Sequence, residues 1–149
     1  MQKLVFDSGV REYQLGEGGV LRFNPSDPNV YARFLKAAEK VTEVEKELVA
    51  KAQAIDGSDG AKVVALMEDA DREIKKILGW VFGAENDFDK ILGGVNLLAV
   101  GANGERVITN LLFTLAPIMQ EGAERCAQQK VNAAVTQAKL NRQQRRAKK

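Results

Sequence analysis

The first residues to test for chemistry in this 149-residue sequence are its acidic clusters, because the chain has no histidine and a single cysteine. Without histidine there is no imidazole base, no histidine-activated nucleophile and no histidine ligand for a metal. Cys126 alone cannot supply the thiolates of a zinc finger or form a disulfide within the chain. We interpret Cys126 as a small, partly buried side chain on a helix.

Two acidic clusters have the spacing of the start of a calcium-binding loop, but both lack its later residues. Such a loop needs glycine at its sixth position and glutamate at its twelfth. Counted from Asp56, these positions hold Ala61 and Met67. Counted from Asp69, the sixth position holds Ile74. We therefore interpret the second cluster as a solvated helix face, made of Asp69, Asp71 and Glu73.

Two glycine-rich segments resemble ligand-binding loops only in part. Residues 16–19 (GEGG) lack the spacing and the following helix of a dinucleotide-binding fingerprint. Residues 101–104 (GANG) have the form of an RNA-binding loop, but Glu105 stands beside them in place of a basic residue. The sequence also contains no GxxxxGK[ST] phosphate-binding loop. We therefore predict no catalytic residue, no metal and no cofactor, and expect a protein that is not an enzyme.

Charge is divided unevenly along the chain. Residues 1–124 carry 14 basic and 20 acidic residues, whereas residues 125–149 carry 8 basic residues and no acidic one. The basic tail, residues 139–149, contains Lys139, Arg142, Arg145, Arg146, Lys148 and Lys149. This tail has two interpretations. It is either a solvated helix end, where cations interact favourably with the helix dipole, or a surface that binds an acidic partner or a nucleic-acid backbone through its charge. It has no aromatic residue to stack on bases, which argues against sequence-specific binding of nucleic acid.

The sequence predicts a protein that has no membrane partner. No segment approaches the ~18 consecutive apolar residues of a membrane-spanning helix. The N-terminal residues, MQKLVFDSGVREY, have no apolar signal-peptide core. We therefore expect the protein in a cytoplasm.

The patterns predict a mainly α fold with a small N-terminal antiparallel β-hairpin. Residues 1–24 contain the apolar run 4–6 and two alternating segments around Tyr13 and Leu21, which predict two or three short strands. We expect residues 1–24 to form the hairpin region and residues 25–138 a helical body in the same domain. Residues 139–149 would be a flexible tail.

Four helices are expected in the body, at about 28–55, 61–82, from 86–87 to 93–94, and from 103–105 to about 140. Apolar residues recur every seven positions in the first helix, at Phe34, Val41, Leu48 and Ile55. This seam predicts packing onto the second helix, or a self-contained coiled coil. Pro117 should kink or split the last helix. Residues 95–104 are compatible with a helical turn or with an extended crossing.

The last helix carries the widest apolar face in the sequence. Its residues are Val107, Ile108, Leu111, Leu112, Leu115, Ile118 and Met119. Such a face either forms part of the core or binds a partner protein, and it is the predicted partner-binding site.

Two segments give the chain a family resemblance. Residues 6–41 contain a G-x-x-Y-x-L strand, residues 9–15, and an RFNPSD turn, residues 22–27, that leads into a long helix. This layout, together with residues 93–119, resembles the tail assembly chaperones of siphophages and prophages of Gram-positive bacteria. The resemblance implies a self-associating, non-enzymatic protein of the bacterial host cytoplasm. It would bind the phage tape-measure protein, keep it soluble, and meet tail tube subunits during assembly.

Two other functions remain open at this point. The first is a structural tail completion or connector subunit that stays in the virion. The second is a small nucleic-acid-binding regulator that uses residues 139–149, whose affinity would fall steeply with added salt.

Overall fold

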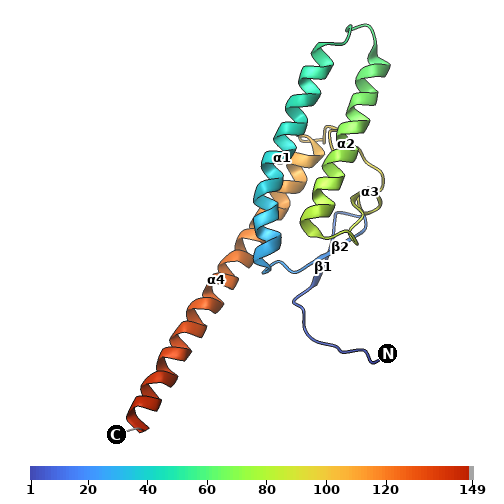
Figure 1. Cartoon of the computed structure of the whole chain (residues 1–149). Coiled ribbons are helices and arrows are strands. Elements are labelled where there is room, and N and C mark those ends of the chain that lie inside the picture. The colour runs from blue at the N-terminus through green and yellow to red at the C-terminus, as the bar shows by residue number, and fades with distance from the viewer. Residues whose placement is uncertain (148–149) are drawn as a thin grey trace.

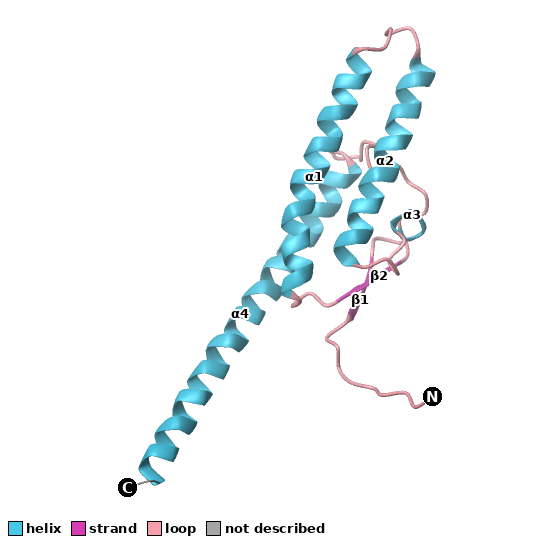
Figure 2. Ribbon diagram, in the orientation of Figure 1, coloured by secondary structure: helices cyan, strands magenta, loops and turns pink. Residues whose placement is uncertain are grey.

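The computed structural model describes residues 1–147 and confirms a mainly α fold with a small N-terminal β-hairpin (Figure 2). Within these residues the strands are β1 (Arg11–Gln14) and β2 (Val20–Phe23). The helices are α1 (Pro28–Gln53), α2 (Gly60–Phe82), α3 (Phe88–Ile91) and α4 (Val107–Ala147). Figure 1 shows α1 and α2 side by side as a hairpin, with the first half of α4 packed beside them and its second half projecting away.

The hairpin pairs β1 with β2 in an antiparallel register that places Tyr13 opposite Leu21. Leu21 and Phe23 are buried while Arg22 between them is exposed, so the predicted alternation is confirmed. The ring of Phe23 lies edge-on to that of Phe82, with centroids 4.8 Å apart. This contact packs the hairpin onto the C-terminal end of α2.

The apolar run at residues 4–6 does not form a third strand. Leu4, Val5 and Phe6 are exposed, and the N-terminal segment extends away from the body (Figure 1). The outer edge of β2 is already bonded to the side chain of Asn86. With that edge occupied, the short run has no strand to pair with on this side of the hairpin.

The seam of α1 packs onto α2, as the heptad pattern predicted. Asp27 begins α1 by accepting a hydrogen bond from Asn29 N–H, and Asp59 caps α2 through Lys62 N–H. Four residues of α1 are buried along the interface: Ala37, Val41, Val44 and Leu48. They face buried residues of α2, among them Ala70, Ile74, Leu78 and Val81. The helix–helix interface, not a self-contained coiled coil, therefore explains the seven-residue repeat.

Helix α4 is a single α-helix of 41 residues, and Pro117 lies inside it without splitting it. Proline removes one backbone hydrogen bond, which leaves the carbonyl of Phe113 without its helical donor. Pro117 and Phe113 are both exposed, so water can solvate this carbonyl. Of the two predicted effects of Pro117, a kink or a split, the split does not occur.

The segment between α3 and α4 crosses the body as a series of turns. Leu97 and Leu98 insert into the core and are almost fully buried. Val100 and Arg106 then form an isolated antiparallel bridge that closes residues 101–105 into a loop. Residues 95–104 thus form turns and bends, and neither the helical turn nor the extended crossing that the sequence left open describes the whole segment.

Candidate functional site

A cleft of about 880 Å³ lies along one side of α2. Helix α2 forms one wall of the cleft, and α3 with the turns around Asn96 forms the other. The apolar lining of the cleft comes from Val64, Met67, Phe88 and Ala99. Its charged lining includes Glu68, Arg72, Lys76 and Asp87. The cleft thus combines apolar walls with charged edges of both signs.

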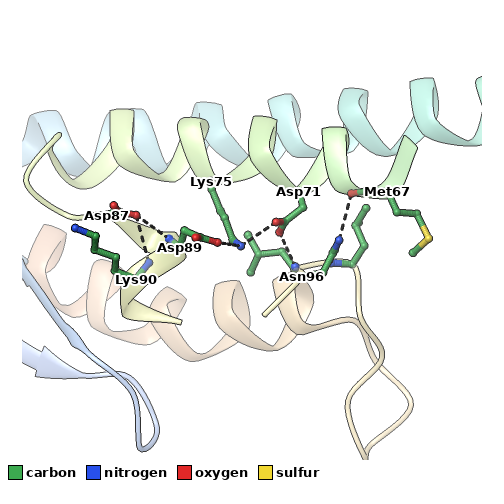
Figure 3. Close-up of polar contacts among 9 residues, drawn as sticks. Met67, Asp71, Lys75, Asp87, Asp89, Lys90 and Asn96 are labelled. Atoms are coloured by element: carbon green, nitrogen blue, oxygen red, sulfur yellow. Dashed lines mark hydrogen bonds and ion pairs between the residues drawn. The ribbon is translucent and has the colours of Figure 1, made fainter. Parts of the chain in front are cut away.

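An ion-pair network holds the two walls of this cleft together (Figure 3). The Nζ of Lys75 lies 2.8 Å from Oδ2 of Asp71 and 2.6 Å from Oδ1 of Asp89. The other carboxylate oxygen of Asp71 accepts a hydrogen bond of 2.7 Å from the backbone N–H of Leu97. Asp71 and Lys75 belong to α2, while Asp89 and Leu97 belong to the opposite wall. The network therefore fixes the spacing of the cleft.

Asp71 is buried, so the prediction that it belongs to a solvated face is wrong. Its side chain is 11% exposed and that of Lys75 is 8% exposed, whereas Asp69 and Glu73 are exposed as predicted. The overlooked signal is the position of Asp71 in the stripe that contains Met67, Ile74 and Leu78. An acid on an apolar stripe, four residues before a lysine, indicates a buried pair.

The protonation state of Lys75 defines what this network can do chemically. Burial on its own lowers the pKa of Lys75, but hydrogen bonds to Asp71 and Asp89 and the charges of both carboxylates outweigh it. The resulting pKa is raised above the ordinary value of 10.5. A lysine that acts as a nucleophile or base needs a lowered pKa instead. Lys75 therefore remains an ammonium ion and serves as a cross-link between the walls.

Two asparagines extend this cross-linking at either end of the cleft. Asn96 donates a hydrogen bond of 3.3 Å from Nδ2 to the carbonyl of Met67, and its Oδ1 accepts from Leu98 N–H. Asn86 is buried and bonds to the backbone of Arg22 and to the carbonyl of Phe82. The cleft is consequently preformed and needs little ordering before it binds a partner.

The face of α4 that the sequence assigned to a partner lies in the core instead. Four of its residues are buried: Ile108, Leu111, Leu115 and Met119. Val107, Leu112 and Ile118 are partly buried and pack against the same core. The apolar residues of α1, α2 and the turns at Leu97 and Leu98 pack against this face, so it is buried within the same chain. The alternative that the face forms the domain's own core is what the structure shows.

The described residues of the basic tail form the exposed end of α4. Lys139, Arg142, Arg145 and Arg146 all project from the helix into solvent, whereas Lys148 and Lys149 lie outside the described residues. The helix continues through the boundary expected at residue 138. Cys126 is half-buried and is a free thiol, as expected of a lone cysteine.

Two further findings concern metals and membranes. Within residues 1–147, no three acidic, cysteine or histidine side chains lie close enough together to hold a metal ion. None of the helices in this part of the chain combines the length and the apolar character needed to cross a membrane.

Comparison with protein-family models, with curated proteins and with solved structures finds no match to this chain.

Proposed function

We propose that this protein is a non-enzymatic phage tail assembly chaperone. It binds the tape-measure protein and keeps it soluble until tail tube subunits assemble around it. The resemblance of residues 6–41 and 93–119 to that family supports the proposal. The structural observation that carries it is the preformed apolar cleft along α2, which offers a surface for a helix of another protein.

The cleft has the features of a groove that receives an amphipathic helix. In this mode of recognition, apolar side chains at three- and four-residue intervals enter the groove and polar residues remain at its edges. Val64 and Met67 lie one turn apart on one wall, and Ala99 lies on the other. Glu68 and Arg72 also line the cleft from α2. They lie one helical turn apart and carry charges of opposite sign. A long protein rich in apolar helices, which the resemblance implies, suits such a groove.

The partner-binding role therefore moves from the buried face of α4 to the cleft. Val64 is the best residue for a test, because its side chain is 55% exposed and it lies in the cleft. Val49 on α1 is a matched control, since it is 50% exposed and does not line the cleft. Replacing either valine by glutamate adds a charge to an exposed helix surface and removes no core packing.

The experiment is a nuclease-treated pull-down of tagged protein from cells that produce the phage tail proteins. We expect the wild type and Val49→Glu to recover the tape-measure protein, identified by mass spectrometry. Val64→Glu should recover at least about tenfold less, because a buried unpaired carboxylate opposes docking. Circular dichroism verifies that both variants remain folded.

Two results would contradict the proposal. Equal recovery by Val64→Glu and Val49→Glu would show that the cleft is not the binding surface. Presence of the protein in purified virions would instead indicate a completion or connector subunit, because an assembly chaperone is absent from the finished particle.

A further inference from the structure

The second half of α4 has no covering element in the described structure. Among the residues of the helix whose side chains are described, Gly122 is the last that is buried, and those of residues 124–147 are exposed or, at Cys126, half-buried. At 1.5 Å per residue this segment extends about 35 Å beyond the body. A helix of this length without tertiary contacts is only marginally stable in water. The projecting segment, defined as residues 124–147, therefore needs a partner to become well ordered.

Basic side chains dominate the far end of the projecting segment. Lys139, Arg142 and Arg146 follow one another at intervals of three and four residues, so they share one face of the helix. Residues 125–149 contain no acidic residue that could neutralise them. Pairing of this end with the same end of another copy would place cations against cations, which is unfavourable. Its partner surface should be acidic.

The same chain carries an acidic groove on α1 and α2. This groove, of about 330 Å³ with a small adjoining hollow, has an apolar floor made of Val44, Leu48, Leu66, Ala70 and Ile77. Its walls carry four acids, which are Glu43, Glu47, Asp69 and Glu73, and two lysines, Lys40 and Lys51. The Nζ of Lys40 lies 3.8 Å from the ring centroid of Trp80. Within residues 1–147, Glu43, Glu47 and Glu73 form no ion pair.

The groove is long enough to hold the basic end of the helix, which is opposite to it in charge. Along α1 the groove extends from Lys40 to Lys51, which corresponds to about 17 Å of helix. The cationic residues from Lys139 to Arg146 cover about 11 Å. Glu43 and Glu47 stand one turn apart on α1, as Asp69 and Glu73 do on α2. A helix in the groove would therefore place its cations between two acidic rows.

One chain cannot bring its own basic end into its own groove. Figure 1 shows that α4 leaves the body beside the start of α1, whereas the groove lies farther along α1 and α2 toward the opposite end. Folding back would require α4 to break. A second copy can supply the helix without any such change.

We propose that this protein self-associates head to tail, with the basic end of α4 from one copy seated in the α1–α2 groove of the next. This contact is heterologous, since the two surfaces are different, so it can propagate into a ring or an open chain. It does not use the cleft along α2 and does not depend on the function proposed above.

The test compares three charge variants of the full-length, nuclease-treated protein by sedimentation velocity. The tail variant carries Lys139→Glu, Arg142→Glu and Arg146→Glu. The groove variant carries Glu43→Lys, Glu47→Lys and Glu73→Lys. The control reverses three exposed acids outside the groove, Glu17→Lys, Glu85→Lys and Glu105→Lys. Circular dichroism establishes that each variant is folded.

We expect the wild type and the control to associate at low salt, and added salt to weaken this association because it screens exposed charges. Each of the other two variants alone should associate at least about tenfold more weakly. Mixed together, they should associate again, because the native tail of the groove variant fits the native groove of the tail variant and the reversed tail fits the reversed groove. A chain with both sets of reversals should associate again.

Three results would overturn the proposal. The first is a wild type that stays monomeric at low salt at every concentration tested. The second is association that survives in both the tail and the groove variants, or a mixture of the two that forms no complex. The third is a tail variant that loses affinity for nucleic acid and associates like the wild type, which would assign the basic end to a nucleic-acid partner.

Discussion

The carboxamide of Asn86 pairs with both backbone groups of Arg22, a residue 64 positions earlier in the chain. Its Oδ1 accepts from Arg22 N–H at 2.9 Å, and its Nδ2 donates to Arg22 C=O at 2.8 Å. The same Nδ2 also donates to the carbonyl of Phe82 at 2.9 Å. One side chain therefore completes the open edge of β2 as a further strand would, and joins the hairpin to the end of α2.

Replacing Asn86 by aspartate should destabilise the protein by about 2–3 kcal/mol. The change keeps the size of the side chain but turns its donor into an acceptor, which leaves two carbonyls without a partner and beside a negative charge. Urea unfolding would measure the effect. Asn29→Asp is the matched control, because Asn29 is exposed in the first turn of α1, where an added acid is neutral or slightly stabilising. Equal stability of the two variants would contradict the role of Asn86.

Replacing Lys75 by methionine should cost about 3 kcal/mol of stability. Asp71 would then be left buried beside the Leu97 N–H without its counter-ion. Lys76→Met removes the neighbouring lysine, which is exposed, and should change stability by less than about 0.5 kcal/mol. Urea unfolding of both variants tests this difference.

A double-mutant cycle separates the ion pair from packing effects. Adding Asp71→Asn to Lys75→Met removes the unpaired charge and should recover part of the lost stability. If the two changes are additive instead, Asp71 and Lys75 are not coupled and the proposed cross-link is wrong.

The raised pKa of Lys75 predicts that the folded protein loses stability at alkaline pH. Its pKa is raised in the folded protein, so the ammonium contributes its full stabilisation below the unfolded pKa, and this is lost as pH rises through the folded pKa. The wild type should therefore lose its stability advantage over the Asp71→Asn/Lys75→Met variant above the ordinary lysine value of 10.5. Unfolding midpoints measured between about pH 9 and 12 would show it. An advantage that stays constant over this range would rule out the linkage.

Gly122 is required where α4 crosses the turn before α1. A Cβ at this position would clash with the carbonyl oxygen of Pro25, so the helix and the turn would have to separate. Gly122→Ala should thus destabilise by about 1–3 kcal/mol, although alanine is the better helix former. Gly60→Ala is the control, since a Cβ there meets nothing within 4 Å. Thermal unfolding should show opposite signs for the two variants, and a Gly122→Ala protein as stable as the wild type would contradict the close approach.

Local patterns were sufficient to predict the hairpin and the positions of the helices. Asp27 and Asp59 mark helix starts because each caps the free N–H groups that follow it in the chain. The seven-residue repeat in α1 and the alternation around Leu21 reflect the periods of helix and strand. These signals depend on residues close together in the sequence, so no knowledge of the tertiary structure was needed to read them.

The surfaces of the protein, in contrast, depend on which segments meet. The apolar face of α4 was visible in the sequence, but periodicity identifies a face without showing whether the same chain or a partner covers it. The place of Asp71 on an apolar stripe was a local sign of burial, but its partner Leu97 is 26 residues away and could not be inferred from neighbouring residues. The cleft, the groove and the projecting end of α4 arise in the same way from contacts between segments far apart in the chain. Such long-range contacts leave no local pattern, and they therefore emerge only when the helices pack.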